Sequence, residues 1–255
     1  MYELNKIYCE EASQFLANLD SESVNMIVTS PPYDSARRYT GFYFPFQDIA
    51  KELYRVIVHG GIAAWVVGDQ TVKGCESLTS FEQALYFKSL GFSVETMIFE
   101  KKNPLPSDTR YRYIQAFEYI FILSKGQPKT FNPIKIRSKD RKYPVRYKQD
   151  DFITTIDKEN KTKIGKEFRI KYNIWSYSTT GSNMTKDKIK HPAMFPEALA
   201  EDLIKSWSNE GDLIVDPMCG SGTTCKVAHL LNRKFLGCDI SSEYCEMASS
   251  RLEKL

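Results

Sequence analysis

Short apolar runs alternate with helical patterns over most of the chain. One run, Val24–Val28, ends at a Pro-Pro turn, and the segment 46–58 carries apolar residues at helical spacing before two glycines. Strands that alternate with helices predict a mostly parallel sheet covered on both faces, and hence an α/β fold. The predicted strands are Ile7–Cys9, Val24–Val28, Ile62–Val67, Phe92–Phe99, Phe117–Leu123, Leu213–Val215 and Phe235–Cys238. The predicted helices are Ala12–Leu19, Phe46–Val58, Leu78–Leu90, Pro196–Trp207, Gly222–Leu231 and Ser242–Leu252.

Residues 126–172 lack this alternation and are interrupted by three prolines. Between Lys125 and Lys171 there are 15 Lys and Arg against 6 Asp and Glu, a net charge of +9, whereas the whole chain carries only +3. We therefore expect residues 1–125 and 173–255 to form two halves of one domain, with 126–172 as a basic insert. Charge alone leaves two interpretations open, a surface that binds a polyanion and a solvated lysine-rich loop.

Composition narrows the class of protein. The chain has no run of about 18 apolar residues, and its first residues lack the basic and apolar regions of a secretion signal. None of the six cysteines forms a CxxC pair, and the three histidines do not cluster with them. We expect a cytoplasmic protein with buried thiols, without a membrane span or a metal site.

A glycine-rich motif follows the strand Leu213–Val215 and opens a helix. Its residues are Asp216, Pro217, Met218, Cys219, Gly220, Ser221, Gly222 and Thr223. Glycines let the backbone approach a ligand closely, and the helix start offers free N–H groups. A P-loop is the rival interpretation, but no Gly-Lys-Ser/Thr follows. A second alternative interpretation is a glycine-rich turn that binds no ligand.

An acid, Asp239, ends the next strand, 19 residues after Gly220. This is close to the spacing at which such folds bind ribose hydroxyls. A lone Asp after a strand is usually a turn or capping residue. Together with the glycine motif, it favours a cofactor site.

The third motif is the loop Thr29–Tyr33, which directly follows the strand Val24–Val28. Pro31 and Pro32 remove two N–H donors and stiffen the turn. The Ser30 hydroxyl and the Pro31 carbonyl could accept hydrogen bonds from an aromatic amino group and favour its pyramidal form, while Tyr33 stacks on the ring. By itself the motif indicates only a rigid turn.

The three motifs together resemble the amino-methylating DNA methyltransferases, the N4-cytosine and N6-adenine enzymes, and their order resembles the circularly permuted β group. Glu10-Glu11-Ala12, residues 53–61 and residues 191–196 are also similar to family segments. The resemblance implies a Rossmann-like, circularly permuted sheet, S-adenosylmethionine as cofactor, and a target-recognition insert at 126–172. It assigns catalysis to Ser30, Pro31, Pro32 and Tyr33. It assigns the cofactor to Glu11, His191, Pro192, Phe195, the motif 216–223 and Asp239.

A circular permutation requires neighbouring termini. We therefore expect the strand Ile7–Cys9 to lie beside the strand that ends at Asp239.

The resemblance also narrows the substrate. Family members with Ser-Pro-Pro-Tyr mostly modify cytosine N4, so Ser30 favours cytosine N4 over adenine N6. Cytosine C5 chemistry needs a Pro-Cys nucleophile, and no cysteine here follows a proline. More distant alternatives are methylation of a protein side-chain amide and a non-catalytic DNA-binding module.

The expected partner is double-stranded DNA, from which the target base would be flipped. A restriction endonuclease acting on the same site is a candidate partner, and the sequence leaves open whether the chain is a monomer or a homodimer. The candidate DNA-binding residues are Arg37, Arg38, Lys135, Arg137, Lys139, Arg141, Lys142, Arg146 and Lys148.

Overall fold

The computed structural model describes residues 2–32, 44–104, 112–137, 143–144, 162–163, 168–179 and 196–255. The chain divides into two compact units. The larger comprises residues 1–132 and 173–255, and the smaller comprises residues 133–172. Each is described by itself.

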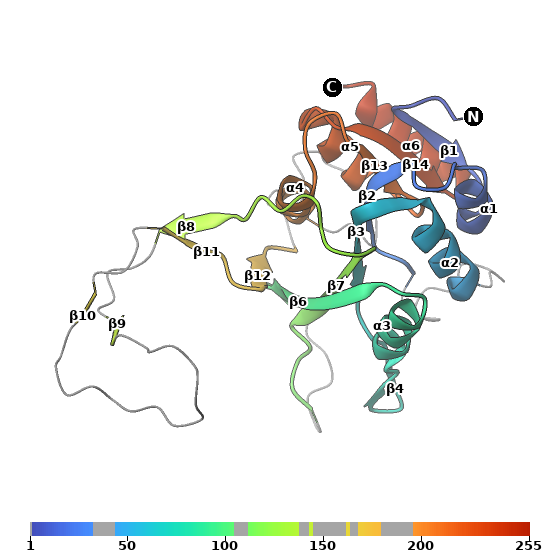
Figure 1. Ribbon diagram of the computed structural model, residues 1–255. Coiled ribbons are helices and arrows are strands. Elements are labelled where there is room, and N and C mark those ends of the chain that lie inside the picture. Colours follow the sequence, from blue (N-terminus) through green and yellow to red (C-terminus); the bar gives the residue numbers. More distant parts are fainter. Residues whose placement is uncertain are drawn as a thin grey trace. The chain divides into compact units, whose positions relative to one another are not determined.

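The larger unit is built on an eight-stranded sheet (Figure 1). In spatial order the strands are β1 (Lys6–Cys9), β14 (Lys234–Asp239), β13 (Leu213–Asp216), β2 (Val24–Thr29), β3 (Ile57–Val67), β7 (Phe117–Ser124), β6 (Ser93–Lys101) and β12 (Ile174–Tyr177). Only β7 runs antiparallel to its neighbours in this sheet. The predicted mixed, mostly parallel sheet is thus confirmed.

Helices cover both faces of the sheet (Figure 1). On one face α1 (Ala12–Ala17) packs against α2 (Phe46–Val56), and α2 packs against α3 (Thr79–Ser89). On the other face α4 (Glu197–Trp207) packs against α5 (Thr223–Leu230), and α5 packs against α6 (Ser242–Leu252). The helices therefore form two layers around one sheet, as the alternation of strands and helices predicts.

The main core lies beneath α1, α2 and α3. Ile49 and Leu53 lie one helical turn apart on α2 and are fully buried. Trp65 of β3 is also fully buried, and its indole N–H donates to Gln83 Oε1 at 2.8 Å, so its polar atom is satisfied. Phe87 packs edge-on against Trp65. Each such side chain contributes roughly 1.5–3 kcal/mol through burial, which holds these helices to the sheet that carries the site.

The two ends of the chain meet in the sheet. β1 pairs in parallel with β14, with Cys9 opposite Asp239. The Asn5 N–H donates to the Phe235 carbonyl at 2.7 Å, and Asn5 Oδ1 accepts the Phe235 N–H at 3.0 Å. The expected neighbourhood of the terminal strands is confirmed, and it is the arrangement that a circular permutation requires.

The predicted helix 46–58 was two residues too long. The helix ends at Val56, and Ile57 adopts an extended conformation and pairs with Val24 of β2. A register shift in β2 and a positive φ of 82° at Gly60 let the chain bend within β3. Pairing of β-branched residues with the neighbouring strand therefore outweighed the helical spacing.

In the larger unit, two features were not predicted at all. The sheet ends in β12 (Ile174–Tyr177), which pairs in parallel with β6. A small hairpin joins β4 (Thr71–Val72) to β5 (Cys75–Glu76) through Lys73 and Gly74, both at positive φ. Lys-Gly is a weaker sequence signal for such a two-residue turn than Asn-Gly.

The smaller unit contains two short antiparallel pairs. β8 (Lys135–Arg137) pairs with β11 (Phe168–Ile170), and β9 (Tyr143–Pro144) pairs with β10 (Thr162–Lys163). The Arg169 guanidinium lies 4.0 Å from the centre of the Tyr172 ring. Among the helices in the described ranges, none is long and apolar enough to cross a membrane.

Candidate active site

Four neighbouring parallel strands end at one edge of the sheet. β2 ends at Thr29, β13 at Asp216, β14 at Asp239 and β1 at Cys9. In open α/β sheets this edge, at the carboxyl ends of the strands, is where ligands bind. The fold thus brings the catalytic loop motif, the glycine motif and the acid at 239 to one place.

A buried hydrogen bond joins the catalytic loop to the glycine loop. Thr29 Oγ1 donates to Asp216 Oδ1 at 2.7 Å, and both side chains are buried. The same carboxylate oxygen accepts the Met218 N–H at 3.2 Å. A second link comes from Thr224, whose hydroxyl donates to the Val28 carbonyl at 3.2 Å. The ends of β2 and β13 are therefore held together by side chains as well as by the sheet.

The Asp216 carboxyl titrates at an unusual pH. Burial raises the pKa of Asp216 to about 6, although hydrogen bonds from Thr29, Thr224 and Met218 oppose the shift. The charge of Asp239 raises the pKa further. Above pH 6 the group is ionised and accepts hydrogen bonds from both loops. The hydrogen bonds of Asp216 link the two loops. Its expected contact with the cofactor stays a prediction.

The predicted catalytic loop begins at the end of β2. Ser30 is half-buried, Pro31 is buried and Pro32 is half-buried. Since neither proline has an N–H, this stretch of backbone presents carbonyl oxygens only. Tyr33, the remaining predicted member, lies outside the described residues.

Asp239 organises the glycine loop. Its Oδ2 accepts the Gly220 N–H at 2.9 Å, and its Oδ1 accepts the Ser241 N–H at 3.0 Å. Burial raises the pKa of Asp239, and these backbone donors oppose the shift. A carboxylate has about four acceptor positions, so each oxygen retains capacity for a ribose hydroxyl. These remaining acceptor positions fit the ribose hydroxyls of S-adenosylmethionine.

The remainder of the motif closes a turn. The Gly222 N–H donates to the Cys219 carbonyl at 2.8 Å, and the Cys219 N–H donates to the Cys238 carbonyl at 2.8 Å. Gly222 has a φ of +75°, which side chains rarely adopt. A Cβ there would lie 2.8 Å from Ala248 Cβ, so Gly222 also allows close packing against α6.

Glu11 caps a helix. Its Oε2 accepts the backbone N–H groups of Ser13 at 3.0 Å and Gln14 at 3.2 Å, and also the Ser13 hydroxyl. The carboxylate therefore forms the N-cap of α1. The preceding residue, Glu10, donates its N–H to the Asp239 carbonyl at 3.1 Å. The predicted contact of Glu11 with the cofactor stays a prediction.

Several predicted residues lie outside the described part of the chain, and others are exposed. Lys135 and Arg137 are exposed on β8 of the smaller unit. The predicted residues outside the described ranges are Tyr33, Arg37, Arg38, Lys139, Arg141, Lys142, Arg146, Lys148, His191, Pro192 and Phe195.

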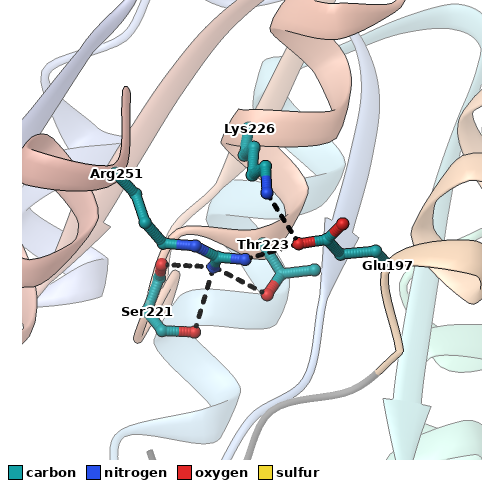
Figure 2. A network of polar contacts seen from close by, with 5 residues as sticks. All are labelled: Glu197, Ser221, Thr223, Lys226 and Arg251. Atoms are coloured by element: carbon teal, nitrogen blue, oxygen red, sulfur yellow. Dashed lines mark hydrogen bonds and ion pairs between the residues drawn. The ribbon is translucent and has the colours of Figure 1, made fainter. Parts of the chain in front are cut away.

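Sequence reasoning missed two features near the predicted sites. The first is a network in which the buried Lys226 and Arg251 pair with the partly buried Glu197 against the glycine loop (Figure 2). The second is Arg169, one of whose guanidinium nitrogens is buried without a hydrogen-bond partner among the described residues. A lone Arg in the last turn of a helix predicts only a favourable dipole interaction, so no sequence signal distinguished Arg251.

Comparison with known proteins identifies the family. A DNA methylase family model, that of the N6/N4 methyltransferases, matches residues 24–250, so the chain belongs to this family. The orphan methyltransferase M.BamHII of Bacillus amyloliquefaciens is 48% identical over 243 residues, which cover 92% of this chain and 91% of that protein. The DNA adenine methyltransferase YhdJ of Escherichia coli K12 is 26% identical over 242 residues, which cover 93% of this chain and 79% of that protein.

Solved structures agree on the fold. The cytosine-N4-specific PvuII DNA methyltransferase superposes with a TM-score of 0.69 at 21% identity, covering 96% of this chain and 85% of that one. The Rossmann-like methyltransferase fold predicted from the sequence is confirmed. Family membership likewise confirms a DNA methyltransferase with S-adenosylmethionine as cofactor.

The raised pKa of Asp216 predicts a pH-dependent stability. The folded state holds this proton up to about pH 6, whereas the ordinary Asp value is 3.8. Stability from the protonated group is present below pH 4 and is lost as pH rises through 6. The free energy of unfolding of the wild type, relative to Asp216→Asn, should fall by about 2 kcal/mol between about pH 4.5 and 7.5. Urea denaturation of both proteins measures it, and parallel curves would contradict the assignment.

Proposed function

We propose that this DNA methyltransferase methylates N4 of cytosine in double-stranded DNA. The observation that carries the proposal is the loop of Ser30, Pro31 and Pro32 at the end of β2, joined through Thr29 to Asp216 beside the glycine loop. S-adenosylmethionine supplies an electrophilic methyl group, and Ser30 at the first position of the Pro-Pro loop favours cytosine over adenine.

The loop would act on the amino group through hydrogen bonds. An aromatic amine is a poor nucleophile because its lone pair is delocalised into the ring. The Ser30 hydroxyl and the Pro31 carbonyl would accept its two N–H bonds and stabilise the pyramidal form that attacks. The chain thus contributes orientation and electrostatic stabilisation, not a covalent intermediate.

The cofactor would bind at the neighbouring strand ends. Asp239 would accept ribose hydroxyls while it holds the Gly220 N–H. The turn closed by the hydrogen bond between Gly222 and Cys219 would bring backbone close to the cofactor. Glu11, His191, Pro192 and Phe195 remain candidates for the adenosine and methionine parts.

The basic smaller unit would hold the DNA. Its net charge supplies phosphate contacts and therefore salt-dependent binding. Arg169 is a candidate contact in addition to Lys135 and Arg137, because its guanidinium is held over the Tyr172 ring in the same basic unit. A preoriented arginine suits guanine or phosphate. The cognate endonuclease and the oligomeric state stay predictions.

The nature of the product tests the proposal directly. The protein is incubated with unmethylated DNA and S-adenosylmethionine labelled in its methyl group, and the DNA is digested to nucleosides. Label in N4-methylcytosine is expected. Label in N6-methyladenine would support the adenine alternative, for which the relative YhdJ gives a precedent, and would contradict the choice of base.

In the same assay, Ser30→Ala should lower kcat by about 100-fold, the scale for loss of one transition-state hydrogen bond. Its Kd for S-adenosylmethionine should stay within about twofold of the wild type, because Ser30 is assigned to the base. Ser89→Ala on α3 is the matched control and should change neither value. A parallel loss of cofactor binding in Ser30→Ala would contradict this division of roles.

Arg169→Met should weaken DNA binding about tenfold and lower the salt slope of log Kd by about 1, as expected for one lost phosphate contact. Lys88→Met removes one exposed positive charge from α3 and is the control. Fluorescence anisotropy with a labelled duplex at several salt concentrations measures both quantities. Equal affinities and slopes in the two variants would remove Arg169 from the interface.

A further inference from the structure

Two buried cations, Lys226 near the start of α5 and Arg251 at the end of α6, meet the partly buried Glu197 at the start of α4 (Figure 2). Glu197 Oε1 accepts hydrogen bonds from Lys226 Nζ at 2.9 Å and from Arg251 Nη2 at 2.7 Å. The side chains of Lys226 and Arg251 are only 5% and 4% exposed. These charges interact with little screening by water, and loss of one partner would be costly to the others.

The second edge of the Arg251 guanidinium holds the glycine loop. Its Nη1 donates to the Ser221 carbonyl at 2.7 Å and to Thr223 Oγ1 at 3.2 Å (Figure 2). The planar guanidinium presents its donors in a fixed geometry. Because Glu197 fixes one edge, the direction of the other edge toward the loop is also fixed.

This contact orients a peptide bond of the cofactor loop. The C=O and N–H of a trans peptide point in opposite directions, so holding the Ser221 carbonyl also sets the Gly222 N–H. That N–H donates to the Cys219 carbonyl at 2.8 Å and closes the turn. Ala248, one helical turn before Arg251 on α6, packs beneath Gly222. One face of α6 therefore contacts the loop through two residues that lie one helical turn apart, Ala248 and Arg251.

The loop is held from both sides by opposite charges. Asp239, just before α6, accepts the Gly220 N–H, and Arg251, in the last turn of α6, donates to the Ser221 carbonyl. We propose that Arg251, held by Glu197, is a positioning residue that sets the glycine loop in its S-adenosylmethionine-binding conformation. The inference rests on the proposed role of this loop in cofactor binding. It extends that site to two residues that do not belong to its motif.

The chain offers a matched control in Arg233. This arginine also holds backbone carbonyls, those of Leu231 at 2.7 Å and Ser208 at 2.8 Å. It directly precedes β14 and so lies at the opposite edge of the sheet from Asp239. Both arginines hold backbone carbonyls of loops, but of the two only Arg251 has hydrogen bonds to the glycine loop among the described residues.

The test compares Arg251→Met with Arg233→Met in the full chain. Binding of S-adenosylmethionine is measured by calorimetry, and Tm is measured without ligand. Both variants should lower Tm, but only Arg251→Met should raise the cofactor Kd, by about tenfold or more, the scale of a lost charged hydrogen bond. Arg251→Lys should lie between Arg251→Met and the wild type. Equal Kd values in the two Met variants would overturn the proposal.

Glu197→Gln keeps the shape of the side chain and provides a test should Arg251→Met fail to fold. Its Gly222 amide should exchange hydrogen faster than in the wild type, and the cofactor Kd should rise while DNA affinity without cofactor stays unchanged. Unchanged exchange and Kd would contradict the proposal. If the wild-type protein binds no S-adenosylmethionine, both this inference and the proposed function are overturned. If the wild type binds it and Arg251→Met binds it with the same Kd, only the inference is overturned.

Discussion

The hydrogen bond from Thr29 to Asp216 is the contact on which the site depends. The catalytic loop and the glycine loop are 187 residues apart in the sequence, and this bond joins them at 2.7 Å. It is buried, where an unpaired hydroxyl or carboxylate would be costly. The two loops therefore keep one mutual geometry, which transfer of a methyl group between a cofactor and a base requires.

Each charged residue around the site makes a different contact. Asp216 links the two loops, Asp239 holds the start of the glycine loop at Gly220, and Arg251 holds that loop at Ser221. Burial raises the pKa values of both acids, and the backbone and hydroxyl donors that contact them oppose this shift. In the proposed function, one end of the sheet would thus place an acceptor-rich loop for the amino group beside a backbone turn for the cofactor.

Patterns in the sequence predicted the sheet, its helices and the position of all three motifs, because strand and helix periods and strand-end residues are local signals. Pairing between distant segments was harder: β12 and the early start of β3 at Ile57 depend on partners elsewhere in the chain. The network of Glu197, Lys226 and Arg251 was not predicted, for the same reason. Its members stand far apart in the sequence, and only packing of α4, α5 and α6 brings them together.

The most direct test of this account is a double-mutant cycle with Thr29→Val and Asp216→Ala, read out as cofactor Kd and as kcat/KM for DNA. If the hydrogen bond couples the loops, Thr29→Val alone will weaken S-adenosylmethionine binding, although Thr29 lies on β2 and not in the glycine loop. The double variant will then be no worse than Asp216→Ala within about twofold, the mark of a shared interaction. A Thr29→Val protein with wild-type cofactor affinity, or effects that multiply in the double variant, would show that this hydrogen bond does not couple the two loops.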